Sequence, residues 1–309
     1  MQIAVIGAGN MGSLYGANLA RAGQSVALVD VWQEHVNQVQ QDGLRMDGLR
    51  GSFVAQVSAT TEPARAPKAD IALVCVNAYS TREAANSAKV LLKDSGFALT
   101  LQNGLGNVEV LTEVLGQNRV MAGLSFHSAE LRSPGYVTHT NDGPTYLGEL
   151  DRSQSERLST ICDLLDRAGM NPTPVPDIWS YIWGKFIYNC AINAVCGITG
   201  LRPGDIQQIP DLDRFQTHIV DEVVALVNAK GIRVPDADPL KKIKEFYAKK
   251  FHRVSMLQHL DRHRLTEVDA LNGYVVRESQ KLGLSAPYND ALTCLIKGRQ
   301  FQSLDGAGT

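Results

Sequence analysis

Short apolar runs, rich in β-branched residues, alternate with helical patterns through the first half of the chain. The predicted elements are the strands Gln2–Ile6 and Ser25–Asp30, the helices Gly12–Ala22 and Glu34–Asp42, and the strand-like runs Ile71–Val76 and Phe97–Leu101. The last two runs do not alternate with polar residues, which is typical of strands covered on both faces. Strands and helices repeated in this order predict an open parallel sheet with right-handed crossovers.

The pattern then changes, and the strand-like segments become separated by short turns. Three such segments cover residues 121–131, 135–140 and 144–150. Close turns of this kind predict a mixed or antiparallel extension of the sheet. A helix is predicted at Ser155–Ala168, and the glycine- and proline-rich stretch 169–176 follows it. We place a domain boundary in that stretch.

Beyond residue 177 the spacing of apolar residues is helical. Helices are predicted at Ile178–Ile198, Leu212–Lys230, Leu240–Phe251 and Glu267–Leu282. We therefore expect an α/β domain over residues 1–172 and an all-helical domain over residues 173–309. Two domains also suit the length, because 309 residues are about twice the usual size of one domain.

Composition narrows the class of protein. The chain is 44% hydrophobic and 20% charged, which is typical of globular proteins and excludes a disordered or collagen-like chain. Its net charge of -2 gives no electrostatic reason to expect binding to nucleic acid or to a membrane surface. The five cysteines are dispersed, the first residues do not resemble a signal peptide, and no apolar run approaches the roughly 20 residues of a membrane helix. A cytoplasmic protein is expected.

A glycine-rich turn follows the first predicted strand and opens the first helix. It reads Gly7-Ala8-Gly9-Asn10-Met11-Gly12. In a dinucleotide-binding turn, Gly7 permits the tight turn, Gly9 lets a pyrophosphate approach the backbone, and Gly12 lets the helix pack closely on the strand. The N–H groups at the start of the helix then face the phosphates. At this junction the motif predicts a Rossmann-type, doubly wound domain that binds a dinucleotide.

The second predicted strand ends in Asp30. A carboxylate at this position can accept hydrogen bonds from both ribose hydroxyls of an adenosine, and it would repel a 2′-phosphate. The next residues, Val31, Trp32 and Gln33, supply no cation. NAD is therefore favoured over NADP. The alternative is that Asp30 only caps the helix that begins near Gln33.

The helix predicted at Ile178–Ile198 carries Lys185, Asn189 and Asn193, which are spaced four apart and so lie along one side of it. Polar groups on a largely apolar helix are costly unless they face one another, water or a ligand. The side of the helix is therefore either a rim with a snorkelling lysine or the lining of a ligand site. In a ligand site, burial would lower the pKa of the lysine and suit it to general acid catalysis.

Glu267 stands at the start of the last predicted helix, next to Thr266. The simplest interpretation of this pair is a helix cap with a carboxylate that complements the helix dipole.

Five separated segments together resemble the ketopantoate reductase (2-dehydropantoate 2-reductase) family. They are GAGNMGSLYGANLARAG from Gly7, LQNGLGN from Leu101, GKFIYNCAIN from Gly184, SMLQHLDRHRLTEVDALNG from Ser255 and GLSAPYN from Gly283. The resemblance covers nearly the whole chain. It implies a Rossmann domain, an all-helical domain and a substrate bound between them. It also implies hydride transfer from a nicotinamide cofactor to the ketone of a 2-oxo acid, as in the conversion of 2-dehydropantoate to pantoate.

The resemblance implies roles for particular side chains. Lys185 would be the general acid for the ketone oxygen, and Glu267 would hold the substrate hydroxyl and help to orient Lys185. The substrate-binding side chains would be those of Asn103, Asn189, Asn193 and Ser255, of which Ser255 would bind the carboxylate. Asn103 would also position the nicotinamide.

The chain departs from the family pattern at four places. Val31 stands where members that use NADPH usually have arginine, and Asn77 stands at a cofactor-binding position that is commonly lysine. Both changes remove positive charge near the cofactor phosphates and favour NADH. Pro203-Gly204 and His252 each stand where a substrate-binding asparagine is expected. The alternative substrate class is therefore that of the related NAD-dependent D-2-hydroxyacid dehydrogenases.

Four histidines and a non-catalytic function are the other candidates in this sequence. His259 and His263 lack the glutamate of a zinc-protease motif, and His127 and His139 are expected to pack in the sheet extension, so no metal site is predicted. A non-catalytic protein that senses NAD(H) is the alternative from another functional class, but it would not need a proton donor such as Lys185. A homodimer is compatible with the sequence.

Overall fold

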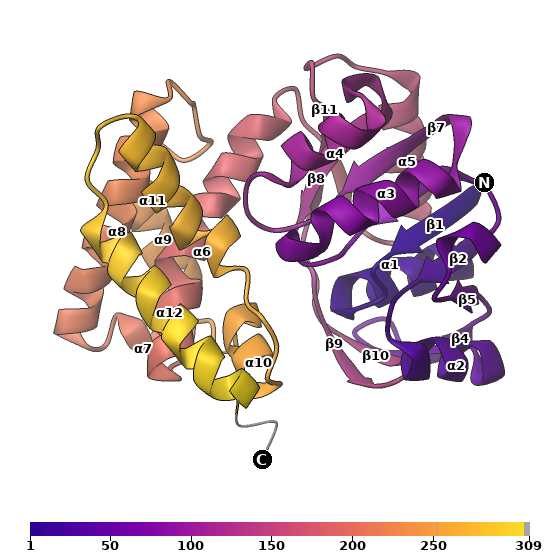
Figure 1. Ribbon diagram of the computed structural model, residues 1–309, viewed down its shortest axis with the longest axis horizontal. Coiled ribbons are helices and arrows are strands. Elements are labelled where there is room, and N and C mark those ends of the chain that lie inside the picture. Colours follow the sequence, from indigo (N-terminus) through magenta and orange to yellow (C-terminus); the bar gives the residue numbers. More distant parts are fainter. Residues whose placement is uncertain (252, 306–309) are drawn as a thin grey trace. The chain divides into compact units, whose positions relative to one another are not determined.

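The structure is a computed structural model that describes residues 1–251 and 253–305, so His252 lies outside the described residues. The chain divides into two compact units, which are drawn in Figure 1. Unit 1 comprises Met1–Gln102 and Gly106–Ile178. Unit 2 comprises the three-residue segment Asn103–Leu105 and the chain from Trp179 onward.

An eight-stranded sheet forms the centre of unit 1, in the order β12-β11-β8-β7-β6-β1-β2-β5. Its strands are β1 (Gln2–Ile6), β2 (Ser25–Val29), β5 (Ser58–Thr60), β6 (Ala69–Val74), β7 (Leu92–Thr100), β8 (Val120–Ser125), β11 (Thr145–Glu149) and β12 (Pro172–Pro174). The six strands from β5 to β8 run parallel, in the order of a doubly wound dinucleotide-binding sheet. The predicted fold class of this half is confirmed.

Five α-helices belong to the described part of unit 1 (Figure 1). They are α1 (Asn10–Arg21), α2 (Gln33–Asp42), α3 (Thr81–Leu91), α4 (Asn107–Leu115) and α5 (Glu156–Arg167). Local sequence sets their ends: the Ser155 side chain accepts a hydrogen bond from Leu158 N and so caps α5, while Gly106 begins α4 in a left-handed conformation. Helices α3 and α4 lie against each other.

A second sheet covers α1 on the side away from the first. It contains β3 (Leu44–Gly48), β4 (Phe53–Ala55), β9 (Ser128–Ser133) and β10 (Tyr136–Asn141), in the order β4-β3-β10-β9. Contacts of α1 with β2 on one side and with β9 and β10 on the other place it between the two sheets. Its buried side chains, among them Leu14 and Tyr15, join both layers into one core.

The second sheet corrects part of the expected sheet extension. Strand β11 does extend the first sheet, antiparallel to β8. Strands β9 and β10 instead leave it: they pair with each other, and β10 also pairs with β3, in a segment for which no strand was predicted. The physical reason is the pair of links that flank the β9–β10 hairpin: Phe126 N donates to Pro144 O (2.9 Å), which holds the two links together where the chain changes sheets.

Unit 2 is helical in its described part. Its helices are α6 (Ile178–Thr199), α7 (Pro203–Ile206), α8 (Pro210–Ala229), α9 (Pro239–Tyr247), α10 (Ser255–Asp261), α11 (Asn272–Lys281) and α12 (Pro287–Asp305). Helices α8, α11 and α12 pack against one another, and α6 supplies much of the core. Among the described helices, none combines the length and the apolar character needed to cross a membrane.

One helix of unit 2 begins later than predicted. Glu267 precedes a single 3-10 turn, Val268–Ala270, and α11 begins only at Asn272. The cause is Leu271, whose backbone (φ -114°, ψ -108°) is not helical and interrupts the run. Glu267 therefore lies in a turn rather than in the first turn of an α-helix.

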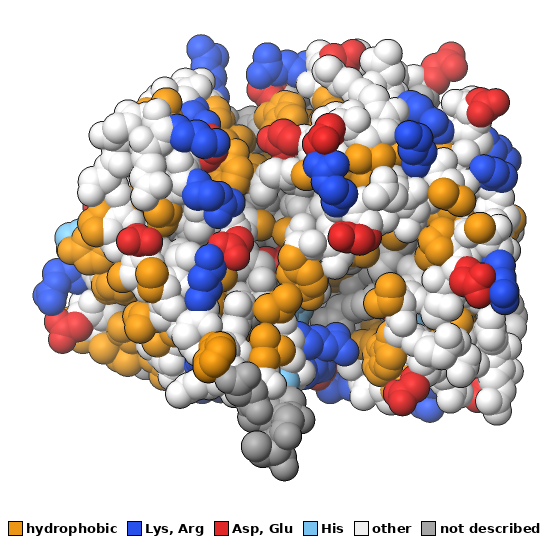
Figure 2. Space-filling view, viewed as in Figure 1, with side chains coloured by type: hydrophobic (Ala, Val, Ile, Leu, Met, Phe, Trp, Pro, Cys, Tyr) orange, Lys and Arg blue, Asp and Glu red, His pale blue; other side chains and the backbone are white. Residues whose placement is uncertain are grey.

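Charged side chains of both signs are intermixed on the face shown in Figure 2. Several of the charged groups in the structure form ion pairs, such as Arg82 with Glu113 (2.6 Å) and Lys242 with Glu245 (3.1 Å). Exposed pairs of this kind contribute little to stability.

The turn between β1 and α1 needs glycine at two positions. Gly7 has φ +88°, and a Cβ on it would lie 2.7 Å from Val76 Cγ1. A Cβ on Gly12 would lie 1.9 Å from Gly7 O, which is backbone and cannot move aside. A Cβ on Gly9 would meet nothing within 4 Å. Packing therefore explains Gly7 and Gly12 but leaves open space in front of Gly9.

We expect Gly12→Ala to lower the free energy of unfolding by about 1–3 kcal/mol, because the new methyl group overlaps the backbone of the turn. Gly9→Ala is the matched control: it adds the same methyl group two residues from Gly7 and should leave stability within about 0.5 kcal/mol. Urea unfolding of both variants measures the difference. Equal midpoints for Gly12→Ala and the unsubstituted chain would contradict this account of the turn.

Candidate functional site

A row of polar side chains lies along α6. Lys185, Asn189 and Asn193 are spaced four apart on this helix, so they lie on one side of it. Asn193 is buried, and its Nδ2 donates to Asn189 O (3.2 Å) and Oδ1 (3.3 Å). The row lies on a helix whose other residues, such as Phe186 and Ile187, are packed in the core of unit 2.

Lys185 is joined to the short segment that unit 2 takes from the loop after β7. Its Nζ donates to Asn103 Oδ1 at 2.8 Å. The segment itself is anchored beside Glu267: Leu105 N donates to Ala270 O (3.1 Å). Gly104 has φ +81°, and a Cβ on it would lie 2.7 Å from the same carbonyl, so this close approach requires glycine.

Two opposing effects set the pKa of the Lys185 ammonium. Burial lowers the pKa from its ordinary value to about 8, because the charged form loses solvation. The carboxylate of Glu267, which is only 9% exposed, acts in the other direction and keeps part of the charge. The group therefore stays largely protonated at neutral pH, yet it releases its proton far more readily than a solvated lysine.

Ser255, the first residue of α10, continues the polar row. Its Oγ donates to Asn193 Oδ1 at 3.3 Å, and the residue itself is exposed. Unit 2 thus brings together every predicted catalytic and substrate-binding residue: Lys185 and Glu267 with Asn103, Asn189, Asn193 and Ser255.

Gln102, which precedes Asn103, is a positioning residue that the sequence reasoning did not identify. Its Nε2 donates to Val76 O (3.0 Å) and to Thr81 Oγ1 (2.9 Å), and its Oε1 accepts from Thr100 Oγ1 (3.0 Å). These bonds hold the end of β7 where the chain passes into Asn103. Gln102 belongs to the motif LQNGLGN, but the family resemblance implies a role only for the asparagine of that motif.

The glycine turn of unit 1 leaves the start of α1 without a side-chain cap. The N-cap residue is Gly9, which has no side chain to accept from the first turn of the helix. The Asn10 side chain is used elsewhere, because its Oδ1 accepts from Leu131 N (2.9 Å). The backbone N–H groups of residues 10–12 and the open space at Gly9 fit an anionic group such as a pyrophosphate.

Asp30 links this turn to the loop after β2. Its Oδ2 accepts from Ala8 N (2.6 Å) and its Oδ1 from Trp32 N (2.9 Å). A carboxylate offers about four lone-pair sites, so two remain for further donors such as ribose hydroxyls. The neighbouring Val31 is 93% exposed and adds no charge. Asn77 lies in the loop after β6, where its Nδ2 donates to Tyr79 Oη (2.9 Å).

The histidines and cysteines are the remaining candidate residues. Burial and the nearby Arg264 and Arg262 lower the pKa of His259 to about 4, and neither His259 nor His263 belongs to a possible metal-binding group among the described residues. His127 and His139 are buried in unit 1, next to each other. All five cysteines are free thiols.

Comparison with known proteins identifies the family of this chain. The family model described as Ketopantoate reductase PanE/ApbA matches residues 3–152, and its C-terminal counterpart matches residues 177–300. A 2-dehydropantoate 2-reductase of Archaeoglobus fulgidus is 32% identical over 96% of this chain and 97% of its own length. The chain belongs to the ketopantoate reductase family. The predicted family and the prediction of an oxidoreductase are therefore confirmed.

Two solved structures show how closely the fold of this family member is shared. A ketopantoate reductase from Ralstonia eutropha superimposes with a TM-score of 0.91 at 30% identity, covering 98% of this chain and 99% of that one. D-mandelate dehydrogenase, solved with NADH and anilino(oxo)acetate, has a TM-score of 0.92 at 25% identity with the same coverage. Ketopantoate reductase family members act with a nicotinamide cofactor, and the glycine turn and Asp30 of this one fit such a group.

This ketopantoate reductase family member departs from the family pattern at a buried position. Pro203 and Gly204, which stand where a substrate-binding asparagine was expected, are buried at the start of α7. Gly204 N donates to Lys250 O (2.9 Å), and a Cβ there would lie 2.8 Å from the Phe251 ring. Packing therefore occupies this position. The second such position, His252, lies outside the described residues.

We expect Glu267→Gln to lower the pKa of Lys185 below about 8, because the carboxylate that favours the ammonium form is removed while burial is unchanged. Asp269→Asn is the control, since Asp269 is exposed and pairs with Lys297. The titration is followed by NMR of lysine labelled with ¹³C at Cε. An unchanged Lys185 titration in Glu267→Gln would show that the two groups are not coupled.

Proposed function

We propose that this protein reduces the ketone of a 2-oxo acid, with hydride from NADH and a proton from Lys185. The proposal rests on the surroundings of the Lys185 ammonium. It donates a hydrogen bond to Asn103, burial lowers its pKa, and the Glu267 carboxylate favours its charged form. In this proposal residues 1–172 bind the dinucleotide and residues 173–309 supply the proton donor and most of the substrate-binding groups.

Lys185 serves two purposes in the proposed reaction. Its positive charge stabilises the alkoxide that develops on the ketone oxygen as hydride arrives at the carbon. Its proton then passes to that oxygen and leaves a neutral amine. With a pKa of about 8, the ammonium form predominates at pH 7, so reduction should slow as the pH rises through this value. The reverse oxidation needs the neutral amine and should respond in the opposite way.

The polar groups around Lys185 select and orient the substrate. Asn189 and Asn193 offer amide groups to a hydroxyl and neighbouring polar atoms, and exposed Ser255 offers a hydroxyl to a carboxylate. From Lys185 to Asn193 the helix rises about 12 Å, which is enough for a small 2-oxo acid with a polar side chain. Glu267 holds the substrate hydroxyl and keeps Lys185 in place.

The cofactor is assigned to the glycine turn. A bound nicotinamide dinucleotide supplies the hydride. The backbone at Gly7, Gly9 and Gly12 and the first turn of α1 would hold its pyrophosphate, and Asp30 would accept from the adenosine ribose. Ala8, Met11 and Asn77 are assigned to the same cofactor site in this proposal, and Asn103 would contact the nicotinamide. The uncharged Val31 and Asn77 support NADH rather than NADPH.

Two substrate classes fit this chain. The first is 2-dehydropantoate, supported by the similarity to enzymes of that name over nearly the full length. The second is the 2-oxo acid of a D-2-hydroxyacid dehydrogenase, supported by the similarity to D-mandelate dehydrogenase and by Pro203-Gly204 at the position of an expected asparagine. A panel of 2-oxo acids that includes 2-dehydropantoate and phenylglyoxylate, followed by NADH absorbance, separates the two classes.

Lys185→Ala should reduce kcat at least about 100-fold and leave the Kd for the dinucleotide nearly unchanged, because only the proton donor is lost. Lys281→Ala, at an exposed lysine paired with Glu278, is the control and should behave as the unsubstituted enzyme. Steady-state rates and fluorescence titration with NADH measure the two quantities. Near-normal turnover of Lys185→Ala would remove this residue from the mechanism.

The unsubstituted enzyme should prefer NADH, and Asp30→Ala should weaken NADH binding and narrow the preference over NADPH, because the carboxylate that accepts from the ribose is gone. Ratios of kcat/KM for the two cofactors are the measurement. Because Asp30 also accepts from Ala8 N, an unfolding curve of the variant serves as the control for damage to the turn. A preference of the unsubstituted enzyme for NADPH would refute the cofactor assignment.

A further inference from the structure

A cluster of two histidines and an aspartate lies where the chain passes between the two sheets of unit 1. His127 lies in the link from β8 to β9, His139 lies in β10, and Asp142 lies in the link from β10 to β11. Both histidines are buried, and Asp142 is 45% exposed. The cluster takes no part in the proposed reaction, and its three ligand atoms all lie within 4.8 Å of one another.

Most of the hydrogen-bonding groups around His127 are acceptors. Its Nε2 lies 3.1 Å from the carbonyl oxygen of Met170, which can only accept, so the single proton of a neutral ring belongs on Nε2. Its Nδ1 then carries a lone pair, yet it lies 3.2 Å from Asp142 Oδ1, which also only accepts. Two acceptors at this distance repel each other unless a positive charge lies between them.

His139 supplies a third possible metal ligand, next to His127 Nδ1. Its Nε2 lies 3.2 Å from His127 Nδ1, and its Nδ1 is buried with no hydrogen-bond partner in the described structure. Without a metal the proton of a neutral ring therefore belongs on Nε2, where Asn141 O (2.9 Å), which can only accept, and the lone pair of His127 Nδ1 lie within reach. A proton moved to Nδ1 would lack a partner, and the bond to a cation at Nε2 must outweigh that cost.

The spacing of these atoms suits a tetrahedral metal ion. Metal–ligand bonds near 2.0–2.1 Å place neighbouring ligands about 3.3 Å apart. Two of the three distances in the cluster are 3.2 Å, and the third, between His139 and Asp142, is within 4.8 Å and would shorten when an ion binds. Two imidazoles and one carboxylate form a ligand set that suits Zn²⁺ and similar divalent transition ions. Mg²⁺ and Ca²⁺ prefer sites made of oxygen ligands alone.

We propose that His127 Nδ1, His139 Nε2 and Asp142 Oδ1 bind a divalent transition metal ion of the Zn²⁺ type. The ion joins the outgoing and returning links of the β9–β10 hairpin and so fastens the second sheet to the first. Its role is structural, because the cluster contains none of the residues placed in the reaction.

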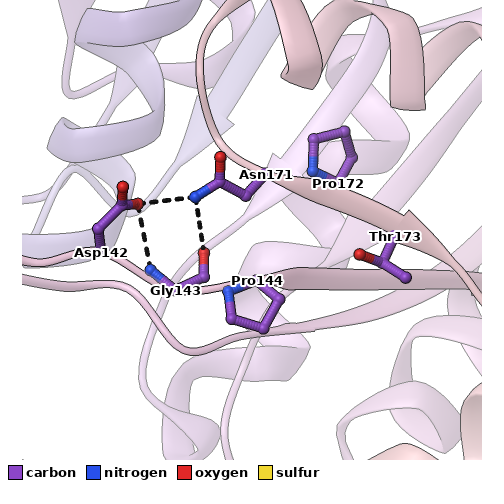
Figure 3. Close-up of a pocket in the computed structure, with 6 residues that line it drawn as sticks. All are labelled: Asp142, Gly143, Pro144, Asn171, Pro172 and Thr173. Carbon is purple, nitrogen blue, oxygen red and sulfur yellow. Dashed lines mark hydrogen bonds between the residues drawn. The ribbon is translucent and has the colours of Figure 1, made fainter.

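The surroundings orient two of the three ligands, His127 and Asp142. The Met170 carbonyl holds His127 by Nε2, which is the usual outer contact of a metal-bound imidazole. Asp142 Oδ1, the proposed ligand atom, accepts from Asn171 Nδ2 (2.9 Å) and Gly143 N (3.1 Å), as Figure 3 shows, and a metal would share this oxygen with them. Arg50 contacts both carboxylate oxygens at 3.1 Å, so the metal must share this carboxylate with a guanidinium.

Solvent reaches the cluster from the side of Asp142. A pocket of about 370 Å³ is lined there by Asp142, Gly143, Pro144, Asn171, Pro172 and Thr173 (Figure 3). An ion can therefore arrive at the carboxylate from solution and keep a water molecule as its fourth ligand.

Untagged full-length protein, stripped with a chelator and dialysed, tests the proposal by calorimetric titration with ZnCl₂. We expect about one Zn²⁺ per chain, a higher Tm with zinc, and a strong visible absorption band when Co²⁺ replaces it, as tetrahedral coordination produces. His139→Gln and Asp142→Asn should each weaken zinc binding at least about tenfold. His218→Gln removes a histidine of unit 2 that stacks on Tyr288, and it should bind zinc normally.

Two outcomes would overturn the proposal. One is no saturable zinc binding, or binding that both cluster variants retain. The other is a His127 ring that ¹⁵N NMR of the metal-free protein shows protonated on both nitrogens at pH 7 and unchanged by zinc, because a second proton would then supply the positive charge. Asp142→Asn keeps shape and exposure, so the test holds even where a histidine variant fails to fold.

Discussion

The partly buried charge of Lys185 is the constraint around which unit 2 is arranged. A long ammonium side chain on an apolar helix loses solvation, and burial lowers its pKa to about 8. Asn103 accepts one of its hydrogen bonds and Glu267 opposes the loss of charge, so the group is held between full ionisation and neutrality. Burial and the Glu267 carboxylate act on this pKa in opposite directions, and the value of about 8 is their balance.

The position of Asn103 also depends on its covalent neighbour. Asn103, the partner of Lys185, follows directly after Gln102, whose amide is bonded to Val76 O and Thr81 Oγ1 in unit 1. One peptide bond therefore joins Gln102, which is held near the end of β7, to Asn103, the hydrogen-bond partner of Lys185. The close contact of Gly104 with Ala270 anchors the same segment next to Glu267. Gly104 has φ +81°, and a Cβ there would lie 2.7 Å from the Ala270 carbonyl oxygen, so this position requires glycine.

Local periodicity was enough to predict the parallel sheet, the helical second half and the row on α6, because each depends on spacing within one element. Asn103 and Ser255 could be proposed only through the family resemblance, since they reach Lys185 and Asn193 across long sequence separations. The pairing of β10 with β3 was missed because it joins strands that are far apart in the sequence. The same is true of the contact between His127 and Asp142, which exists only after the chain crosses between sheets. Glu267 was expected to begin a helix, and the backbone of Leu271 prevents this.

A crystal structure of the ternary complex with NADH and a non-reacting 2-oxo acid analogue tests the central claim most directly. The account predicts that Lys185 Nζ lies within hydrogen-bond distance of the oxygen that replaces the ketone, about 2.7–3.1 Å away, with Asn103 still bonded to Lys185. An analogue oxygen held by other groups, with the Lys185 ammonium directed into solvent, would contradict it.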